Sequence, residues 1–423
     1  MNHLCGMTLA EMRHGLDKKQ FSPRELLAAH LEQGRRLDHR LNAFTVRFDP
    51  PLATGEAGVL AGIPLSVKDS LDVAGYATVC GSPARLTLRA ARHALCVERL
   101  LGAGAVLLGK TNTPELLMNW ETHNTVHGFT ANPYHPGLTA GGSSGGEAAA
   151  IAAGLSAGGM GSDGGGSIRL PAGFCGICGL KPTPGRVPAT GHFPGVGLPG
   201  GLLGVIGPMA RTVSDLKLIF RVVSGHADSD PFSVPAAACD FPDAVEVLAF
   251  DHPDTQLAAN AFGLDPHEFR WPHWQRAFAV WEFFFLRLNA HAIGFPTPHT
   301  AEFLALPPPS AEEILAMFAA RDALRRDLLE LMSESTVLLL PNPGVAPWRP
   351  GEFPGVRAMA PLTLANLLGL PALAVPIGLD AEGLPRSVQL VAKPWAEDQL
   401  LRFGEKLESR RGPFPRPALA QAS

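Results

Sequence analysis

Apolar positions recur at helical spacing in the first part of the chain. Between Thr8 and Leu41 they return every three or four residues, and the pattern is interrupted at Phe21-Ser22-Pro23. A serine followed by a proline is typical of a helix start, because the serine caps the helix and the proline suits its first turn. This stretch therefore predicts two consecutive helices.

Short apolar runs beside glycine and proline predict buried strands further along the chain. The first covers residues 62–67 and ends at Lys68-Asp69, so it brings a lysine to a strand end. A helix-like segment over residues 90–101 and an apolar run over residues 105–108 follow it. Helices that alternate with buried strands predict an α/β architecture.

The last third of the chain returns to regular patterns after an irregular stretch. Residues 226–309 are punctuated by proline and rich in aromatic side chains, and we interpret them as variable decoration, with WEFFF at residues 281–285 on a helix. The sheet is then expected to resume. The pattern predicts helices over residues 311–332 and 360–368 and strands over residues 337–340, 372–377 and 387–391.

Glycine and other small residues dominate residues 141–166, which read GGSSGGEAAAIAAGLSAGGMGSDGGG. We expect a glycine-rich loop, a helix at about residues 146–153 and a second glycine-rich loop. Glycine loses more conformational freedom on folding than any other residue. So many glycines are costly to order, so we interpret this segment as a candidate functional segment.

Composition narrows the class of protein. The chain has 423 residues, 46% of them hydrophobic and 17% charged, and can bury a large core. Its net charge of -4 and the lack of a dense Lys/Arg run argue against nucleic acid as a partner. The charged N-terminal segment argues against a signal peptide, and no window is apolar enough for a membrane span. With six scattered cysteines, too few for a disulfide framework, we expect a soluble, cytoplasmic protein.

Several local motifs point to other chemistries but lack the required context. Ser144 fits the nucleophile-elbow pattern G-x-S-x-G of α/β-hydrolases, but no apolar strand precedes it. Residues 159–164 contain a lone G-x-G-x-x-G, but no acidic residue follows about twenty positions later, as a dinucleotide site requires. Cys175 and Cys178 form a C-x-x-C without a second metal-binding pair, and we interpret them as two buried thiols.

Three histidines precede the first glycine loop and suggest a Ser-His mechanism. They are His123, His127 and His135. Histidines in a polar connection are more often surface residues, so contact with a substrate stays a minor alternative.

The segments around the remaining lysine and serines resemble a known family. The segment from GKTNTPELLMNWETHN through GGSSGG to GGSIRLPAGFCGICGLKPTPGRVP is similar to the amidase signature sequence. The similarity extends through IPLSVKDSLDVAGYATVCGSP, GPMARTVSDL and APLTLANLLGLPALAVPIG, and covers most of the chain except about residues 227–335. It implies the amidase signature fold, an α/β/α arrangement in which helices cover both faces of a large mixed β-sheet.

The resemblance also implies one amidase domain over residues 1–423. We expect N-terminal helices at about 8–41, a catalytic signature core at about 60–225, a variable aromatic substrate-side region at about 226–335 and a C-terminal return of the sheet at about 336–423. One departure lies in the core, since Gly164 stands where relatives often carry threonine or isoleucine in T-D-T-G or T-D-I-G.

The family motif implies a catalytic triad. Lys68 would be the base, Ser143 the proton relay and Ser167 the nucleophile, and the two serines stand 24 positions apart. A lysine with its ordinary pKa of about 10.4 serves as a base only if burial favours its neutral form. The family mechanism also implies a cis peptide bond between Gly142 and Ser143.

The resemblance assigns neighbouring residues as well. Asp163 and Arg169 would hold the loops, and no metal or cofactor is implied. A glycine run lets several N–H donors converge on one oxyanion. Those donors would belong to Gly164, Gly165, Gly166 and Ser167. The acyl pocket would be lined by Leu117, Met118 and Trp120, with the aromatic segment 281–285 either closing it or serving as ordinary core.

These features predict an amidase that hydrolyses a small-molecule amide, aryl or medium-chain, to an acid and ammonia or an amine. Two alternatives stay open. One is the amidase-like subunit of a tRNA-dependent amidotransferase, which releases ammonia from glutamine for a partner. The other is a carbamate or ester hydrolase on the same triad. A non-catalytic relative would be expected to lose the lysine or a serine, and a homodimer is left open.

Overall fold

A large mixed sheet runs through the computed structural model, which describes residues 3–55, 57–195, 203–236, 241–293, 297 and 299–421. Within these ranges the sheet has eleven strands in the order β1-β3-β2-β6-β8-β7-β12-β13-β11-β9-β10. Their bounds are β1 (Phe44–Leu52), β2 (Pro64–Lys68), β3 (Val106–Thr111), β6 (Gly158–Asp163), β7 (Cys178–Lys181), β8 (Val205–Ala210), β9 (Glu246–Ala249), β10 (His267–Glu268), β11 (Thr336–Pro341), β12 (Ala372–Leu379) and β13 (Pro385–Val391). A separate hairpin joins β4 (His123–Asn124) to β5 (Gly128–Phe129).

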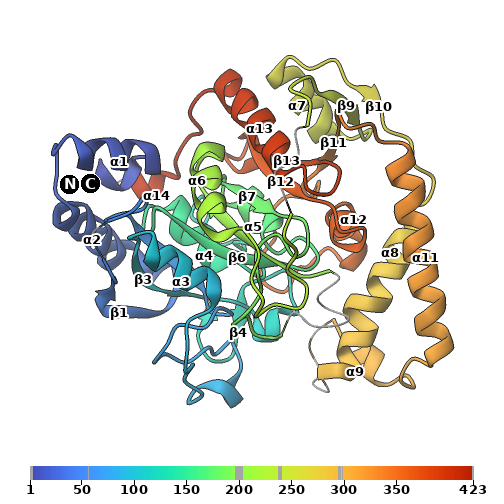
Figure 1. Cartoon of the computed structure of the whole chain (residues 1–423), viewed down its shortest axis with the longest axis horizontal. Helices are drawn as coiled ribbons and strands as arrows, with labels where there is room; N and C mark the ends of the chain where they lie inside the picture. The colour runs from blue at the N-terminus through green and yellow to red at the C-terminus, as the bar shows by residue number, and fades with distance from the viewer. Residues whose placement is uncertain are drawn as a thin grey trace.

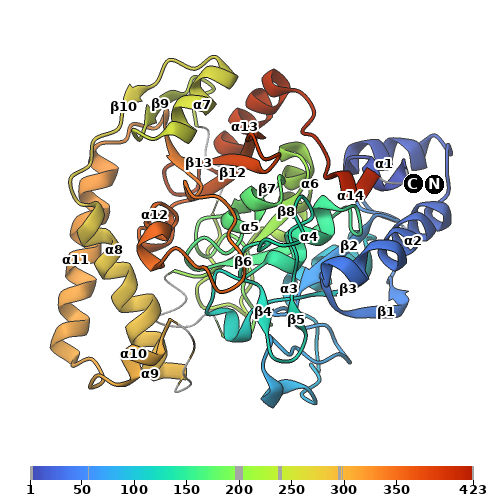
Figure 2. The same cartoon turned by 180° about the vertical axis from the view of Figure 1, so that it is seen from behind.

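Both parallel and antiparallel pairs occur in the sheet. β2 lies parallel to β3 and to β6, whereas β8 is antiparallel to β6 and to β7. The C-terminal strands then join through β12, which is antiparallel to β7 and β13. The sheet is therefore continuous from the N-terminal strands to the C-terminal ones, as Figures 1 and 2 show.

Helices cover both faces of this sheet. In β11, Val337 and Leu339 belong to one buried cluster, and the alternate residues Leu338 and Leu340 belong to another. Residues on the two sides of a strand alternate, so both faces are buried. The first cluster includes α1 (Leu9–Asp17), α3 (Leu95–Gly102), α6 (Val213–Val223), α7 (Pro253–Phe262) and α13 (Glu397–Arg411). The opposite face carries α4 (Gly145–Ala152), α5 (Arg169–Phe174), α8 (Trp274–Glu282), α11 (Ala311–Glu330) and α12 (Ala360–Leu367).

The two predicted N-terminal helices are present as α1 and α2 (Pro23–Leu41). Each begins with a capping box, formed by Thr8 with Glu11 and by Ser22 with Glu25. Such a box satisfies two backbone donors that a helix start leaves free. In Figure 1 these helices lie beside the C-terminal α14 (Ala418–Gln421), where both ends of the chain meet.

The C-terminal helices and strands also lie within a few residues of their predicted bounds, but two earlier predictions are wrong. Residues 90–94 are not helical, because Ala90 and Ala94 donate their N–H groups to Tyr76 and Asp72, and α3 starts at Leu95. The second glycine-rich loop contains β6, a central buried strand. A Cβ on Gly159 would lie 2.0 Å from a Glu147 carboxylate oxygen of α4, so this close contact requires glycine.

The stretch interpreted as decoration contributes to the core. β9 pairs parallel with β11, and α8 continues as a π-helix, η5 (Phe283–Leu288), which agrees with the predicted helical WEFFF. The shorter helices are α9 (Asn289–Ile293), α10 (Ala301–Leu304), η1 (Leu4–Gly6), η2 (Pro83–Arg85), η3 (Glu115–Leu117) and η6 (Val356–Met359). Of the helices in the described ranges, none combines the length and the apolar character that a bilayer crossing requires.

Candidate active site

Lys68 lies at the end of β2, where strands on both sides bury it completely. Its Nζ is 2.7 Å from Ser143 Oγ, 3.0 Å from Ser162 Oγ and 3.3 Å from the Ser162 carbonyl. Burial lowers the pKa of Lys68 from 10.5 to about 7. All three neighbours are uncharged, so a large fraction of this amine is neutral near pH 7.

Two other buried lysines lie in different surroundings. Lys110 Nζ is 2.8 Å from Asp69 Oδ1 and also donates to the Ala77 carbonyl, which ties it into a buried ion pair. Lys181 Nζ donates to the Pro182 carbonyl, and burial lowers its pKa to about 7. In the described ranges Lys68 is the lysine that contacts Ser143, as the sequence predicts. No signal in the sequence marked Lys181 as a second lysine with a lowered pKa.

The two predicted serines lie on neighbouring loops. The peptide bond between Gly142 and Ser143 is cis, as the resemblance implies. Ser143 is enclosed next to Lys68, whereas Ser167, 7% exposed, borders a cavity. The Ser144 N–H donates to the Ser167 carbonyl at 3.1 Å, which ties the start of α4 to the turn before α5. Ser143 thus lies on the enclosed side of the site and Ser167 on the side of the cavity.

Asp163 organises the backbone around Ser167. Its Oδ1 accepts the Gly166 N–H at 2.7 Å, and its Oδ2 accepts the Ile168 N–H at 3.0 Å. Burial alone would raise the pKa of Asp163, but the Arg169 guanidinium outweighs this and holds the pKa well below its usual range. Both side chains of this ion pair are fully buried. These contacts fix the loop around Ser167, and the supporting role of Asp163 and Arg169 stays a prediction.

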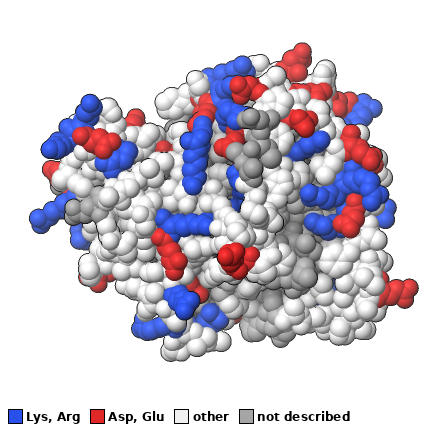
Figure 3. All heavy atoms as spheres, viewed as in Figure 1, with Lys and Arg blue, Asp and Glu red and all other residues white. Residues whose placement is uncertain are grey.

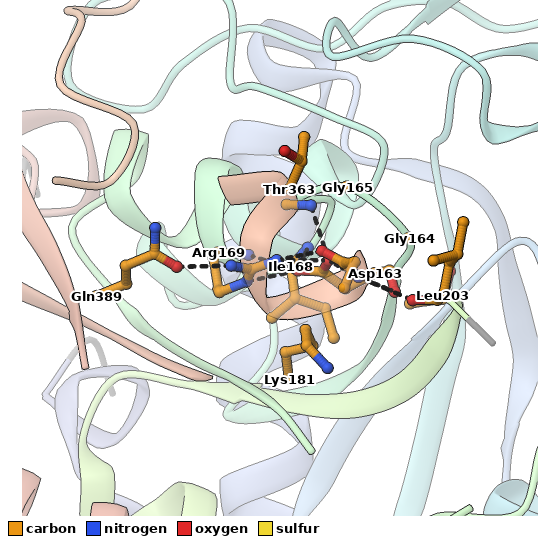
Figure 4. Close-up of polar contacts among 12 residues, drawn as sticks. Asp163, Gly164, Gly165, Ile168, Arg169, Lys181, Leu203, Thr363 and Gln389 are labelled. Atoms are coloured by element: carbon orange, nitrogen blue, oxygen red, sulfur yellow. Dashed lines mark hydrogen bonds and ion pairs between the residues drawn. The ribbon is translucent and has the colours of Figure 1, made fainter. Parts of the chain in front are cut away.

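Arg169 extends this network to the C-terminal half of the chain. Figure 4 shows its side chain between Asp163 and Gln389. It donates to Gln389 Oε1 and to Asn366 Oδ1, both at 2.6 Å. Asn366 in turn donates to Asp163. Sequence reasoning did not find these two amide partners, because α12 and β13 lie about 200 positions away.

Glu147 is a further buried carboxyl near Lys68. It accepts from Ser66 Oγ at 2.6 Å and from Thr111 Oγ1 at 2.7 Å, and so joins α4 to β2 and β3. Burial raises its pKa to about 7. Glu147 therefore titrates in the same range as Lys68, although no local pattern in the sequence indicates this.

The glycine loop before Ser167 presents several unused donors. Within the described part of the chain, the N–H groups of Gly164, Gly165 and Ser167 have no acceptor. The Gly166 N–H is directed to Asp163 instead. The prediction that Gly166 is an oxyanion donor is corrected accordingly, because a donor engaged by a buried carboxylate is not free to bind a second anion.

The predicted pocket residues line a narrow cavity at Ser167. The cavity is lined by Leu117, Met118 and Trp120 together with Phe285 and Leu286 of η5. Asn119 and Gly165 complete the described lining, in which no side chain is charged. The aromatic segment thus borders the cavity and also belongs to a buried cluster.

The remaining candidates lie elsewhere. Cys175 and Cys178 are buried free thiols, as predicted. Ser144 is fully buried and donates to the Ser162 carbonyl, so it is not exposed as an elbow nucleophile. The three histidines are absent from the described lining of the cavity. No group of metal-binding side chains occurs among the described residues.

Charged side chains of both signs are mixed on the surface shown in Figure 3. On that face, Lys and Arg are interspersed with Asp and Glu and form no continuous basic surface. A nucleic-acid backbone is bound by clustered positive charge. This face therefore has no cluster of positive charge of the kind that binds nucleic acid.

Comparisons with known proteins agree with this geometry. The Amidase family model matches residues 39–250 and 305–401. A glutamyl-tRNA(Gln) amidotransferase subunit from Roseiflexus castenholzii is 31% identical over 478 residues, 96% of each chain. The structure of 6-aminohexanoate cyclic dimer hydrolase has a TM-score of 0.85 at 26% identity and covers 99% of both chains. The crystal structure of an amidase has a TM-score of 0.78 at 27% identity, and the match covers 96% of this chain and 100% of that chain. The unmatched residues 251–304 contain α7, α8 and η5.

Proposed function

Because the chain belongs to the amidase signature family, we propose that it hydrolyses a small, uncharged carboxylic amide through an acyl-enzyme on Ser167. One observation carries this proposal above the others. The Lys68 amine, whose pKa is lowered to about 7, lies 2.7 Å from Ser143 Oγ. A buried amine of this kind has the protonation state that a general base requires near neutral pH.

The proposed reaction begins with proton transfer. Ser143 takes the hydroxyl proton of Ser167 while it passes its own proton to neutral Lys68. The Ser167 oxygen then attacks the amide carbon, and the proton returns through Ser143 to the leaving nitrogen. Water repeats the cycle on the ester and releases the acid. Lys68 thus acts as base and then as acid, which a pKa near neutral pH allows.

The developing oxyanion has three candidate donors. They are the N–H groups of Gly164, Gly165 and Ser167, which no described acceptor occupies. Removal of one such donor typically lowers kcat about 100-fold to 1000-fold. Asp163, paired with Arg169, stabilises the loop that carries these donors, since it accepts the backbone N–H groups of Gly166 and Ile168.

The lining of the cavity favours an uncharged acyl group. Glutamine carries an ammonium and a carboxylate, and an unpaired charge in such a pocket is expensive. The described lining residues offer neither charge a partner. Aryl or medium-chain amides would instead gain about 0.8 kcal/mol for each buried methylene. Carbamates and esters are accessible to the same acyl-enzyme route.

A second candidate is a glutamine-dependent amidotransferase subunit. The full-length likeness to the glutamyl-tRNA(Gln) amidotransferase protein favours it. The two proposals differ in which amide the chain hydrolyses and in whether the purified chain hydrolyses it without a partner protein. We expect the chain by itself to hydrolyse phenylacetamide and hexanamide with higher kcat/KM than glutamine, and Ser167→Ala to hydrolyse neither. Hydrolysis of glutamine alone, or only with added partner proteins, would favour the amidotransferase.

A further inference from the structure

Trp281 reaches the catalytic loop from outside the part of the chain that matches the family. It lies on α8, is fully buried, and donates its indole N–H to the Gly164 carbonyl at 3.0 Å. Trp120 donates its indole N–H to the next carbonyl, that of Gly165, also at 3.0 Å. Two indoles from distant segments thus hold two consecutive carbonyls just before Ser167.

The planarity of the peptide unit gives these contacts a consequence. Within one peptide plane the carbonyl of a residue and the N–H of the next residue point in opposite directions. A donor on the Gly164 carbonyl therefore sets the direction of the Gly165 N–H. In the same way, Trp120 on the Gly165 carbonyl sets the direction of the Gly166 N–H.

The two peptide planes differ in how they are held. The plane between Gly165 and Gly166 is fixed at both ends, by Trp120 and by Asp163 Oδ1. The plane between Gly164 and Gly165 has a described partner at one end, and this partner is Trp281. Because glycine is free to adopt many backbone conformations, this second plane depends on Trp281 for its orientation.

Aromatic rings also pack closely against this loop. A Cβ on Gly165 would lie 2.5 Å from Trp281 Cζ2, and one on Gly164 would lie 2.3 Å from Phe285 Cε2. The Trp281 and Phe285 rings are stacked at 5.0 Å. Phe285 thus fills the space beside Gly164.

We propose that Trp281 is a positioning residue that aims the Gly165 N–H at the oxyanion formed on Ser167. This inference rests on the proposed function, because it presupposes acyl transfer at Ser167. It also gives the segment outside the family match a role in the reaction.

The test removes the indole donor and keeps the ring. Two variants at Trp281 are compared with the control Trp271→Phe. One is Trp281→Phe. In the other, benzothienylalanine, which has sulfur in place of the indole N–H, replaces Trp281. Trp271 is a matched control, since it is also buried and donates its indole N–H, but to Asp327 at 2.6 Å. The first readout is the rate at which a fluorophosphonate labels Ser167, and the second is kcat and KM for phenylacetamide.

We expect both changes at Trp281 to lower the labelling rate and kcat at least about tenfold, because a misdirected oxyanion donor acts in the transition state. KM should stay within about twofold, and Trp271→Phe should change kcat no more than about twofold. Wild-type labelling and kcat in the benzothienylalanine protein would overturn the inference and leave the proposed function intact. Absence of labelling in the unmodified protein would sink both.

Discussion

The pH dependence of turnover follows from the environment of Lys68. We expect kcat/KM to rise about tenfold per pH unit below about pH 7 and to level off above it, because the active form has a neutral amine. Burial lowers the pKa of Lys68 from 10.5 to about 7. About half of the molecules are then active at pH 7 and about 1% at pH 5, whereas an ordinary lysine would leave fewer than about one in a thousand active at pH 7.

The rise in kcat/KM below pH 7, the ascending limb of the pH profile, has a second candidate group. Burial raises the pKa of Glu147 to about 7 as well. Glu147→Gln separates the two groups. The negative charge of Glu147 raises the pKa of Lys68, so its removal should move the limb to lower pH and leave it present. If Glu147 itself were the titrating group, the limb would vanish in this variant.

The assay is kcat/KM for phenylacetamide from pH 5 to 10 in buffers of constant ionic strength, with Ser167→Ala as the blank. Folding at each pH is checked by circular dichroism. A limb with an apparent pKa near 10 would show that Lys68 has its ordinary pKa, and a limb lost in Glu147→Gln would assign it to the carboxyl. Either result would refute the reasoning.

Three further changes have definite expected outcomes. Asp163→Asn should lower the free energy of unfolding by about 3 to 5 kcal/mol in urea, because it leaves buried Arg169 without its carboxylate; the exposed Asp17→Asn should change it little. Cys175→Ser should keep wild-type kcat, measured on phenylacetamide, and a loss would implicate the thiol. Trp120→Ala should flatten the rise in kcat/KM from acetamide to hexanamide, and an unchanged slope would move the acyl pocket elsewhere.

The parts predicted well from sequence are those with local signals. The strand that ends at Lys68 is a short, mainly apolar run, and the helix starts at Ser22 and Ser310 carry their own caps. The serines were placed by a motif whose spacing is itself informative. Such features depend on residues within a few positions of one another, so no knowledge of tertiary contacts was required.

The parts that were missed depend on contacts between distant segments. β6 reads GGMGSD and has no apolar alternation, because the neighbouring strands and helices leave little room for a Cβ at its glycines. At Gly159, for example, a Cβ would meet the Glu147 side chain of α4 and the Ser66 carbonyl of β2. Two hydrogen bonds depend on how loops and helices pack against each other. One joins the Gly166 N–H to Asp163, and the other joins the Trp281 indole to the Gly164 carbonyl. The sequence indicated that the aromatic segment 281–285 is helical and either closes the pocket or belongs to the core, but no local feature revealed its hydrogen bond to Gly164.

Trapping of the acyl-enzyme tests the central claim most directly. The protein is mixed with p-nitrophenyl phenylacetate, whose leaving group makes acylation fast, and is quenched in acid within the first turnover for peptide mass spectrometry. The account predicts a phenylacetyl group on Ser167, its absence in Ser167→Ala, and its slower appearance in Lys68→Ala. A phenylacetyl group on Ser143, Ser144 or a cysteine, with turnover preserved in Ser167→Ala, would contradict it.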